Sequence, residues 1–548
     1  MIRRVSIRRF KRFEDVAFEL PGHVVVAGPN NTGKTTLLQA IAAFDLALAH
    51  WQELNDFQRH GGAYTRAPIA RQAFAAVPLR SFDLLWSERQ QGDPIEIEIE
   101  FERGLQLGME FIANTTEQTF VRPLRRFPPE DLRGARLGCV FVPAMSGLGV
   151  EEPVYQPPKI EQLLFQARPG EVLRNLLLQV SNQGEAWNAL TASIRELFGY
   201  VLQPPDGRGA NILAEYSPRP DGPRLDIASA GSGFLQVLML LTFLHTRPGS
   251  ILLLDEPDAH LHVILQDAVY AELRRVAAEK RSQLVIATHS EVIIDAAEPR
   301  HVCVLLDRPR MLADTEERAV LIRSLKSLTN EDVMRAIDAP GILYVDDYTD
   351  LDILREWARI LSHPAHELLT TRLFWKPNVA EPHAGVAGVP AQKHHEAVCL
   401  VRTDLPALQI LDGDNRAEIP TTPITGSGFQ RIRWRRYEIE SYLFHPGVLE
   451  RFVGAAVGEG AAADHVAALH EHLVQAHPPA FLKDPLGDHA FLVGVKARIL
   501  LLPPALHAAG LPGFPYQRYF EIASVMQPAE IHPEVREKLG AIVKAFRQ

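Results

Sequence analysis

Residues 28–35 read GPNNTGKT, and this stretch decides the fold of the first half of the chain. It satisfies the pattern GxxxxGK[ST] and lies between a buried strand predicted at His23–Ala27 and an apolar helix predicted at Thr36–Leu48. Backbone N–H groups at the start of such a helix bind phosphate oxygens. This context favours a nucleotide-binding loop over a chance glycine-rich turn. The residues expected to bind ATP are Gly28, Asn30, Asn31, Gly33, Lys34, Thr35 and Thr36.

The chemistry of this loop assigns separate roles to two of its side chains. Lys34 is expected to reach the β- and γ-phosphates, and the Thr35 hydroxyl is expected to bind Mg²⁺. A second motif, ILLLDEP at Ile251–Pro257, predicts a buried strand that ends in two carboxylates. Asp255 is expected at Mg²⁺, and Glu256 is expected to orient and deprotonate the attacking water. The alternative is that both carboxylates cap the next helix.

Three further segments resemble ABC-type ATPases, in the order in which that family carries them. Ser229-Ala-Gly231-Ser232-Gly233 resembles the signature loop, with Ser229, Gly231 and Ser232 as candidates for γ-phosphate binding. Asp258–His262 resembles the D-loop, and His289, after a predicted strand, resembles the switch histidine. A Ser/Gly helix cap is the alternative for the first segment. The ABC resemblance implies a head-to-tail pair of ATPase heads, because one chain's signature completes the other's site.

The beginning of the chain resembles the entry strand of SMC-like and RecF-like ATPases. The pattern is Val5-Ser-Ile-Arg-Arg-Phe10-Lys11-Arg12-Phe13, and the resemblance implies that Lys11 or Arg12 reaches the nucleotide. The chain lacks an apolar leader here, and its longest apolar runs are too short to span a bilayer. Three cysteines without a CxxC pair fit a reducing compartment. We therefore expect a cytoplasmic protein without a membrane segment.

The length and net charge of the chain limit the number of domains and the ways in which it could bind nucleic acid. The chain has 548 residues and a formal net charge of −10, so nucleic acid would have to be bound by local basic patches. We expect an α/β protein with two domains. The first, residues 1–335, is an ABC-type P-loop ATPase head with a helical insertion at about 145–205. The second, residues 336–548, is a smaller α/β domain with a helical C-terminal extension.

Acidic residues follow two predicted buried strands of the second domain. Asp346 and Asp350 come after Ile342–Val345, and Asp412 and Asp414 come after a strand that ends at Leu411. Carboxylates at the carboxyl ends of parallel strands converge, and such a cluster favours Mg²⁺ or Mn²⁺. Surface carboxylates that cap helices are the alternative, and Asp350 in particular is placed to be such a cap.

Two basic features and one further acid belong to the same hypothesis. Phe429–Arg436 reads FQRIRWRR, in which alternate arginines would share one face of a strand and contact a phosphate backbone. The following Tyr437-Glu-Ile-Glu440-Ser-Tyr-Leu would add Glu440 to the cluster. Lys496 is a candidate for a transition-state cation, and a surface salt bridge is the alternative role.

The acidic strand ends resemble a Toprim domain, and an ABC ATPase joined to Toprim resembles the OLD (overcoming lysogenisation defect) family of ATP-dependent nucleases. The resemblance implies DNA as substrate, Asp346, Asp412 and Lys496 as catalytic residues, and metal ligation by Asp346, Asp350, Asp412, Asp414 and Glu440. It also implies a homo-oligomer formed through the heads and a role in anti-phage defence with a partner protein. The usual Val-Glu-Gly of the first Toprim motif is replaced by Val345-Asp346-Asp347. A sensor or scaffold with a non-cleaving Toprim domain is therefore the alternative function.

Overall fold

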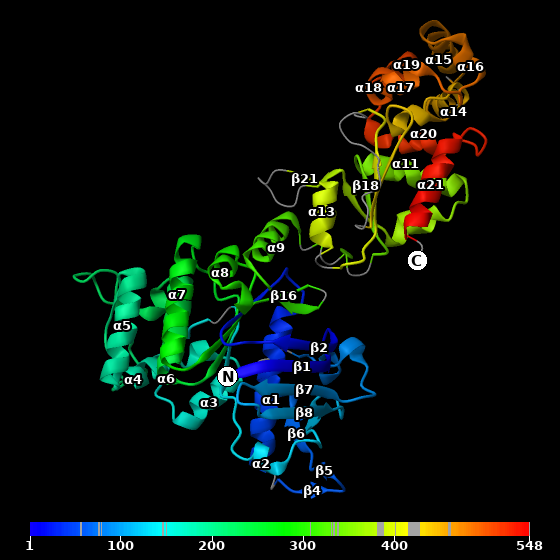
Figure 1. Ribbon diagram of the computed structural model, residues 1–548. Helices are drawn as coiled ribbons and strands as arrows, with labels where there is room; N and C mark the ends of the chain where they lie inside the picture. Colours follow the sequence, from blue (N-terminus) through cyan, green and yellow to red (C-terminus); the bar gives the residue numbers. More distant parts are fainter. Residues whose placement is uncertain are drawn as a thin grey trace. The chain divides into compact units, whose positions relative to one another are not determined.

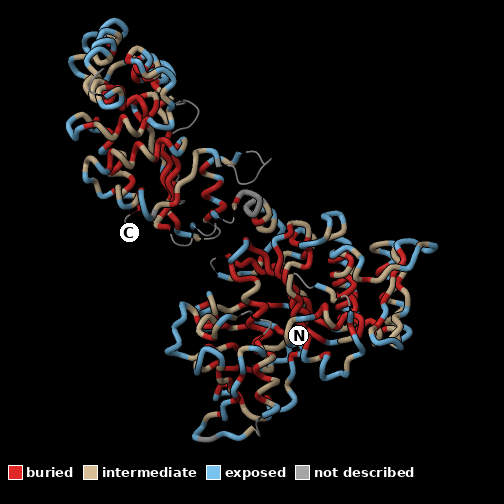
Figure 2. Tube along the Cα trace, turned by 180° about the vertical axis from the view of Figure 1, so that it is seen from behind, coloured by how far each residue is buried: buried red, intermediate tan, exposed pale blue. Residues whose placement is uncertain are grey.

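The computed structural model divides the chain into two compact units, Met1–Leu325 and Lys326–Gln548 (Figure 1). The division lies about ten residues before the boundary expected from the sequence. In each unit the buried residues form the interior and the exposed residues surround it (Figure 2). The structure describes all residues except 55–56, 75–76, 78, 145–146, 150, 307, 330, 333–334, 337–338, 381–387, 400–401, 415–427, 459–461 and 547–548.

A six-stranded sheet carries the nucleotide motifs of the first unit. Its neighbouring strands are parallel except for the last pair, and the three strands on which the motifs lie are almost continuously apolar and buried. Strands with two buried faces are expected to read in this way. The spatial order is β10 (Cys139–Val142), β14 (Ile251–Asp255), β15 (Gln283–Thr288), β3 (Val24–Ala27), β16 (Val302–Leu305) and β17 (Pro309–Met311).

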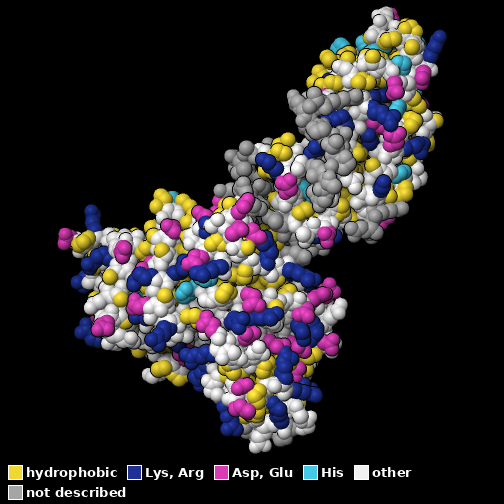
Figure 3. Space-filling view, viewed as in Figure 1, with side chains coloured by type: hydrophobic (Ala, Val, Ile, Leu, Met, Phe, Trp, Pro, Cys, Tyr) yellow, Lys and Arg dark blue, Asp and Glu magenta, His cyan; other side chains and the backbone are white. Residues whose placement is uncertain are grey.

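A second, antiparallel sheet of six strands completes the core of this unit. Strand β7 alternates buried isoleucines with partly exposed glutamates, as a sheet with one buried face requires. Its outer face mixes basic and acidic side chains, as in the pair Arg8–Glu96, and Figure 3 shows both kinds interspersed over these strands. The order is β2 (Phe13–Glu19), β1 (Ile2–Phe10), β7 (Ile95–Phe101), β8 (Gln106–Ile112), β9 (Gln118–Pro123) and β6 (Ala67–Ala70).

Helix α1 (Lys34–Leu54) packs between the two sheets. It contacts β10, β14 and β15 of the parallel sheet and β1, β6, β7, β8 and β9 of the antiparallel sheet. Its apolar residues lie all around the helix, which explains how it can be covered on both sides. The phosphate-binding loop therefore leads directly into a helix that is covered on both sides.

The other helices of the first unit surround the parallel sheet or form the predicted insertion. Three helices, α3 to α5, lie within the stretch 145–205, and α4 and α5 both contact α6. Small two- and three-stranded sheets are formed by β4 (Arg59–His60) with β5 (Ala63–Tyr64), and by β11 (Val201–Leu202), β12 (Glu215–Ser217) and β13 (Leu225–Asp226). The helices are α2 (Pro129–Leu132), α3 (Pro157–Phe165), α4 (Leu173–Ser181), α5 (Gly184–Phe198), α6 (Ser232–Thr246), α7 (Val263–Glu279), α8 (Glu291–Ala296) and α9 (Thr315–Ser327).

The second unit is built on a four-stranded parallel sheet. Its order is β19 (Phe374–Pro377), β18 (Ile342–Val345), β22 (Ala407–Leu411) and β23 (Phe429–Arg433). A short hairpin, β20 (Val379–Ala380) with β21 (Val389–Pro390), follows β19. Helices α11 (Tyr348–Ile360), α12 (Ala365–Glu367) and α13 (Ala391–Val398) connect the strands, and a π-helix occupies Leu368–Arg372. The expected α/β arrangement with parallel strands is thus present in this unit.

The C-terminal extension is helical, as its sequence predicts. It shares one apolar core with α11 and the parallel sheet, from Leu343 through Trp357 to Phe546. Its helices are α14 (Pro446–Val457), α15 (Ala462–Ala476), α16 (Pro479–Lys483), α17 (Ala490–Gly494), α18 (Ala497–Leu500), α19 (Leu502–Ala508), α20 (Phe520–Ser524) and α21 (Pro533–Phe546). Within the described part of the chain, no helix is long and apolar enough to cross a membrane.

Candidate functional site

The phosphate-binding loop lies between the end of β3 and the start of α1. Neighbouring atoms leave no room for a side chain at two of its positions, which explains the glycines there. A Cβ atom on Gly28 would lie 2.3 Å from the carbonyl oxygen of Leu305, so no other residue fits there without a shift of the backbone. Gly33 has a φ of +108°, and a Cβ atom there would lie 2.7 Å from Phe13 and 2.8 Å from Arg12. The turn between β1 and β2 therefore supports the loop from behind.

The side chain of Lys34 lies inside the loop and is hydrogen-bonded to its backbone. Its Nζ donates hydrogen bonds of 2.9 Å to the carbonyl oxygens of Gly28 and Pro29, and it lies 3.6 Å from Oε1 of Glu256. Burial lowers the pKa of Lys34, and the nearby carboxylates of Glu256 and Asp255 act in the opposite direction. The ammonium thus lies at the centre of the loop, where the phosphate groups of a nucleotide would be bound.

Thr35 and Asp255 come together from the two motifs. The Thr35 hydroxyl donates to both carboxylate oxygens of Asp255, at 2.9 and 3.1 Å, although the two residues are 220 positions apart. Burial raises the pKa of Asp255, and the Thr35 hydrogen bond opposes that effect. One hydroxyl and one carboxylate supply the oxygen donors that Mg²⁺ prefers, so this pair fits the expected ion.

Glu256 and His289 form a second pair beside the first. His289 follows the end of β15, and its Nδ1 lies 2.7 Å from Oε2 of Glu256. The hydrogen bond to Glu256 raises the pKa of His289. Glu256 has a φ of +46°, an uncommon conformation for a residue with a side chain. Asp258, two residues later, accepts a 2.6 Å hydrogen bond from Thr288, which fixes the D-loop to the same strand end.

Four further ATP-site candidates lie in or next to the loop. Asn30 and Asn31 are exposed on the loop, and Asn31 has a left-handed φ of +63°. Thr36 is the third residue of α1. Lys11, in the turn after β1, donates a 2.7 Å hydrogen bond to Gln39 of α1, and burial lowers its pKa.

The segment Ser229–Gly233 leads into α6. Ser229 ends a one-turn helix, η5 (Ile227–Ser229), and its hydroxyl donates to the Asp226 carbonyl at 2.7 Å. Gly231 is the N-cap of α6 and Ser232 is its first residue, so no serine side chain caps this helix. The Ser/Gly cap that the sequence offers as an alternative is therefore present through Gly231, and the phosphate-binding role of the two serines stays a prediction. A Cβ atom on Gly233 would lie 2.6 Å from the His260 carbonyl oxygen, so α6 begins directly against the D-loop.

A buried arginine that the sequence analysis missed anchors this segment. Arg174 of α4 is 1% exposed, and its Nη2 donates to Oδ1 of Asp226 at 2.8 Å. The same oxygen accepts from the Ala228 backbone N–H at 2.7 Å, which caps the turn that carries Ser229. Glu152 accepts hydrogen bonds from the Arg174 and Asn175 backbone N–H groups. Arg174 lies in an unremarkable helical stretch, so no local pattern could have identified it.

In the second unit, the carboxyl edge of the parallel sheet brings four acids into electrostatic contact. Burial raises the pKa of Asp412 to about 9, and Asp346 and Glu440 add to the shift. The pKa of Glu440 is raised to about 7, again first by burial. Burial also raises the pKa of Asp350 well above its usual range, with Glu440 as the strongest charged neighbour.

The details of this edge differ from the expectations in two ways. The N-cap of α11 is Asp347, whose Oδ1 accepts from the Thr349 N–H at 2.7 Å, whereas Asp350 accepts from the Asp346 N–H at 3.1 Å. Asp350 is therefore not the helix cap. Among the residues that the structure describes, no three His, Cys, Asp or Glu side chains are arranged to hold a metal ion. Asp414 is partly exposed and contributes electrostatically to the shifts of Asp346 and Asp412.

Arg498 is a cation in contact with this acidic edge, and it was not predicted. Its Nη1 and Nη2 each lie 3.1 Å from Oδ2 of Asp347, and its Nε lies 3.8 Å from Oε1 of Glu440. Its guanidinium carbon lies 3.5 Å from the centre of the Tyr516 ring. Lys496, the predicted cation, is the N-cap of α18 and affects Asp346 and Glu438 electrostatically. Arg498 lies only two residues beyond Lys496. This closeness to the predicted cation is the feature of the sequence that could have pointed to Arg498.

The predicted arginine stripe is shorter than expected. Arg431 and Arg433 lie in β23, which ends at Arg433, so Arg435 is outside the strand. Arg431 donates to the Gln409 side chain at 2.8 Å and Arg433 to the Asp412 carbonyl at 2.6 Å. Arg435 pairs with Glu537 of α21 at 2.8 Å. Trp434 is buried, and the strand ends here because the chain turns to pack this ring into the core.

Comparison with known proteins identifies the type of the first unit. Residues 149–295 match the model of a family described as "AAA domain, putative AbiEii toxin, Type IV TA system". No curated protein matches the sequence.

Several solved structures of SMC heads are similar to parts of the chain. An SMC head bound to the C-terminal winged-helix domain of ScpA is 15% identical, covers 55% of this chain and 93% of its own, and has a TM-score of 0.34. A Pyrococcus furiosus head with an extended coiled coil, bound to the C-terminal domain of ScpA, is 14% identical, with coverages of 59% and 98% and a TM-score of 0.35. The Thermotoga maritima head is 12% identical, with coverages of 57% and 99% and a TM-score of 0.31. The family match, together with the loop at 28–35, identifies the chain as carrying an ATPase domain.

Proposed function

We propose that the first unit hydrolyses ATP with Glu256 as the base and uses that reaction to control the association of two heads. The observation that carries the proposal is the placement of two pairs side by side, Thr35 with Asp255 and Glu256 with His289. Lys34 joins them, because its Nζ lies within the loop and 3.6 Å from Glu256. These side chains come from segments that are far apart in the sequence. Their close arrangement is therefore poorly explained by coincidence.

The residues define the reaction that this arrangement supports. Thr35 and Asp255 would hold Mg²⁺, which on binding neutralises charge on the β- and γ-phosphates. Glu256 accepts a proton from a water molecule while the water oxygen attacks the γ-phosphorus, and the bond to the β-phosphate oxygen breaks to release ADP. His289 holds the Glu256 carboxylate by the 2.7 Å hydrogen bond and donates toward the γ-phosphate. Lys34 exchanges its carbonyl contacts for phosphate oxygens.

The first experiment tests the base. Glu256→Gln keeps the size of the side chain but removes its basicity, so ATP turnover should fall at least about a hundredfold while ATP binding persists. Glu185→Gln, which changes an exposed glutamate at the start of α5, is the matched control and should leave turnover unchanged. Unchanged turnover in Glu256→Gln would refute the assignment.

The proposal of a paired site rests on the start of α6. This 15-residue helix has no side-chain cap, so its first N–H groups are available to an anion, and Ser229, Gly231 and Ser232 surround that end. They would bind the γ-phosphate of ATP held by a second copy of the chain. Each head would then supply half of two composite sites, related by twofold symmetry.

Mixing two inactive variants tests this pairing directly. Lys34→Ala disables the loop and Ser232→Arg blocks the start of α6, so each homodimer is inactive. A one-to-one mixture forms mixed dimers in which one of the two sites is intact, and about a quarter of wild-type turnover should return. A mixture that stays as inactive as its components would contradict the composite site.

For the second unit we propose phosphodiester cleavage at the acidic edge as its candidate activity, as an OLD-type nuclease that acts on DNA in anti-phage defence. The observation in favour is the set of coupled carboxyls at the carboxyl ends of β18 and β22, with Asp346 and Asp412 in the catalytic positions and Lys496 and Arg498 as nearby cations. Among the described residues, these acids are not arranged to hold a metal ion. Activity would require Arg498 to release Asp347 and Glu440.

A nicking assay separates this activity from the scaffold alternative. Supercoiled plasmid is incubated with the full chain, ATP, and Mg²⁺ or Mn²⁺, using wild type, Asp412→Ala, and Asp404→Ala as an exposed control near the same strand. Cleavage that Asp412→Ala abolishes and Asp404→Ala retains supports the nuclease. No cleavage by wild type with intact ATP turnover favours a scaffold whose second unit binds a partner protein or nucleic acid. Phage plating with the same three variants tests the role in defence.

A further inference from the structure

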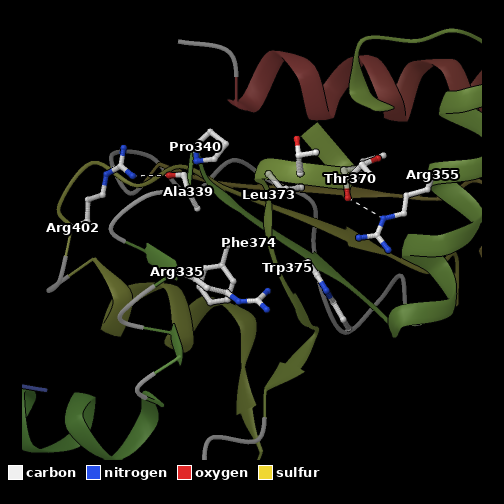
Figure 4. A pocket seen from close by; sticks show the side chains of 11 residues that line it. Arg335, Ala339, Pro340, Arg355, Thr370, Leu373, Phe374, Trp375 and Arg402 are labelled. Atoms are coloured by element: carbon white, nitrogen blue, oxygen red, sulfur yellow. Dashed lines mark hydrogen bonds between the residues drawn. The ribbon is translucent and has the colours of Figure 1, made fainter. Parts of the chain in front are cut away.

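The second unit contains a cavity of about 860 Å³ that the proposed functions do not use. Three arginines, Arg335, Arg355 and Arg402, line it together with Phe374 and Trp375. Figure 4 shows Arg402 and Arg355 at opposite ends of the cavity, with Phe374 and Trp375 between them. A volume of this size is within the range of small-molecule sites in proteins.

The cavity lies at the amino-terminal edge of the parallel sheet. Its lining comes from the residues before β18, from the first residues of β19 and from Arg402, which precedes β22. Arg355 of α11 and residues 369–371 of the π-helix complete it. Asp346 and Asp412 follow the opposite ends of β18 and β22. The four residues of β18 separate the two edges by about 13 Å, at 3.3 Å per residue. The cavity is therefore distinct from the acidic edge.

The charge of the cavity is one-sided. Among the lining residues that the structure describes there are three arginines and no aspartate or glutamate. Two of these arginines have carboxylate partners that are exposed: Arg335 pairs with Glu331 and Arg355 with Asp352, through side chains that are between 35% and 62% exposed. The Nε of Arg355 also donates a 2.9 Å hydrogen bond to the Leu369 carbonyl, which leaves its two terminal nitrogens to face an anion. Such exposed pairs contribute little stability, so an anion can replace them at small cost. Guanidinium groups bind phosphate through two parallel hydrogen bonds.

The aromatic residues add a second kind of recognition. Trp375 is partly buried and packs against the apolar core of the second unit, so its ring is held in place and one part remains accessible. The guanidinium carbon of Arg335 lies 6.0 Å from the centre of the Phe374 ring, which positions this arginine over that ring. Arg402 donates a 2.6 Å hydrogen bond to the Ala339 carbonyl, which fixes the rim before β18. An indole and fixed cations together suit a ligand that joins a planar ring to an anion.

We propose that this cavity binds a nucleoside phosphate, with the phosphate at Arg335 and Arg355 and the base on Trp375. The site is separate from the ATP site of the first unit and does not depend on ATP hydrolysis or nuclease activity. The ligand is either a free nucleotide or one nucleotide of a single strand, since both present the same chemistry.

Isothermal titration calorimetry with the full chain in a Lys34→Ala background tests the proposal, because this background weakens nucleotide binding at the loop. The probes are AMP, inorganic phosphate and the oligonucleotide (dA)6. AMP should bind saturably. Arg335→Gln and Arg355→Gln should each weaken AMP binding about tenfold, and Trp375→Ala should weaken it by a similar factor. Arg359→Gln is the matched control, because Arg359 lies one turn beyond Arg355 on α11 and pairs with Glu356 away from the cavity.

The outcomes are decisive in either direction. Binding that falls in the cavity variants and persists in Arg359→Gln supports the site, and tighter binding of (dA)6 than AMP assigns the ligand to a nucleic-acid strand. Binding of phosphate alone as tight as AMP overturns the role of Trp375. No saturable AMP or (dA)6 binding, or equal binding by Arg335→Gln and Arg359→Gln, overturns the proposal. Arg335 has a side chain that is 48% exposed, so Arg335→Gln tests the site even if Arg355→Gln does not fold.

Discussion

His245 makes the stability of the first unit dependent on pH. It lies near the end of α6, is 4% exposed, and neither of its ring nitrogens has a hydrogen-bond partner among the described residues. Burial, aided by Lys280, lowers its pKa from 6.5 to about 4. The folded state therefore disfavours the charged imidazolium, whereas the unfolded chain accepts a proton near pH 6.5.

The sign and size of the effect follow from this difference. Between pH 4 and pH 6.5 the unfolded state binds more protons than the folded state. The free energy of unfolding is therefore not reduced by His245 above pH 6.5, and it falls as the pH decreases toward 4. The loss should be about 2 kcal/mol at pH 5 and about 3 kcal/mol below pH 4. His245→Leu removes the titrating group and the unpaired nitrogens, so it should also stabilise the unit by about 1 kcal/mol at pH 8.

Urea unfolding at pH 5 and pH 8 measures both effects. The free energy of unfolding of wild type should fall by about 2 kcal/mol more than that of His245→Leu between these pH values. His260→Gln, which removes an exposed imidazole from the same unit, should behave as wild type. Parallel pH dependence in wild type and His245→Leu would refute the reasoning.

Three substitutions test other contacts. Arg174→Leu should destabilise the first unit by about 2 kcal/mol, measured by urea unfolding, and should lower ATP turnover because the turn before α6 loses its anchor. Gly28→Ala should weaken ATP binding at least about tenfold in a titration, since the new methyl would meet the Leu305 carbonyl at 2.3 Å. Gly413→Ala should destabilise the second unit by about 2 kcal/mol or more, measured by urea unfolding, since its methyl would lie 1.9 Å from the Arg436 carbonyl oxygen.

Gly540→Ala is the matched control for Gly413→Ala. Gly540 lies within α21 of the same unit, and a Cβ atom there would meet nothing within 4 Å. Alanine favours the helix by about 0.5–1 kcal/mol, so this variant should be neutral or slightly more stable. Equal loss of stability in both glycine variants would contradict the steric explanation.

Local motifs made part of the site predictable. The loop at 28–35 is flanked in the sequence by an apolar strand and an apolar helix, and Asp255 directly follows four apolar residues. In both cases the residues next to the motif are enough to predict the local structure. Parallel strands then bring Thr35 and Asp255 together, because β3, β15 and β14 are neighbours in one sheet. The expectation that Asp346 and Asp412 lie on one edge follows from the same property of parallel strands.

The remaining features depend on contacts between distant segments, which no local pattern encodes. Leu305 restricts Gly28 across 277 positions, and Arg174 reaches Asp226 from another helix. Arg498 could not be distinguished from Lys496, because the two lie two residues apart and only the turn into α18 decides which one meets Asp347. The antiparallel sheet likewise pairs β1 with β7, which lie far apart in the chain.

The position of α1 between two sheets has a consequence for measurements of motion. A helix covered on both faces can exchange its amide hydrogens only when the whole core opens, so its exchange rate reports the global stability of the unit. Nucleotide bound at its first turn would slow that exchange by mass action along the full length of the helix, far beyond the residues that touch phosphate. Amide exchange of α1 would thus serve as a reporter of nucleotide occupancy for this chain, independent of turnover.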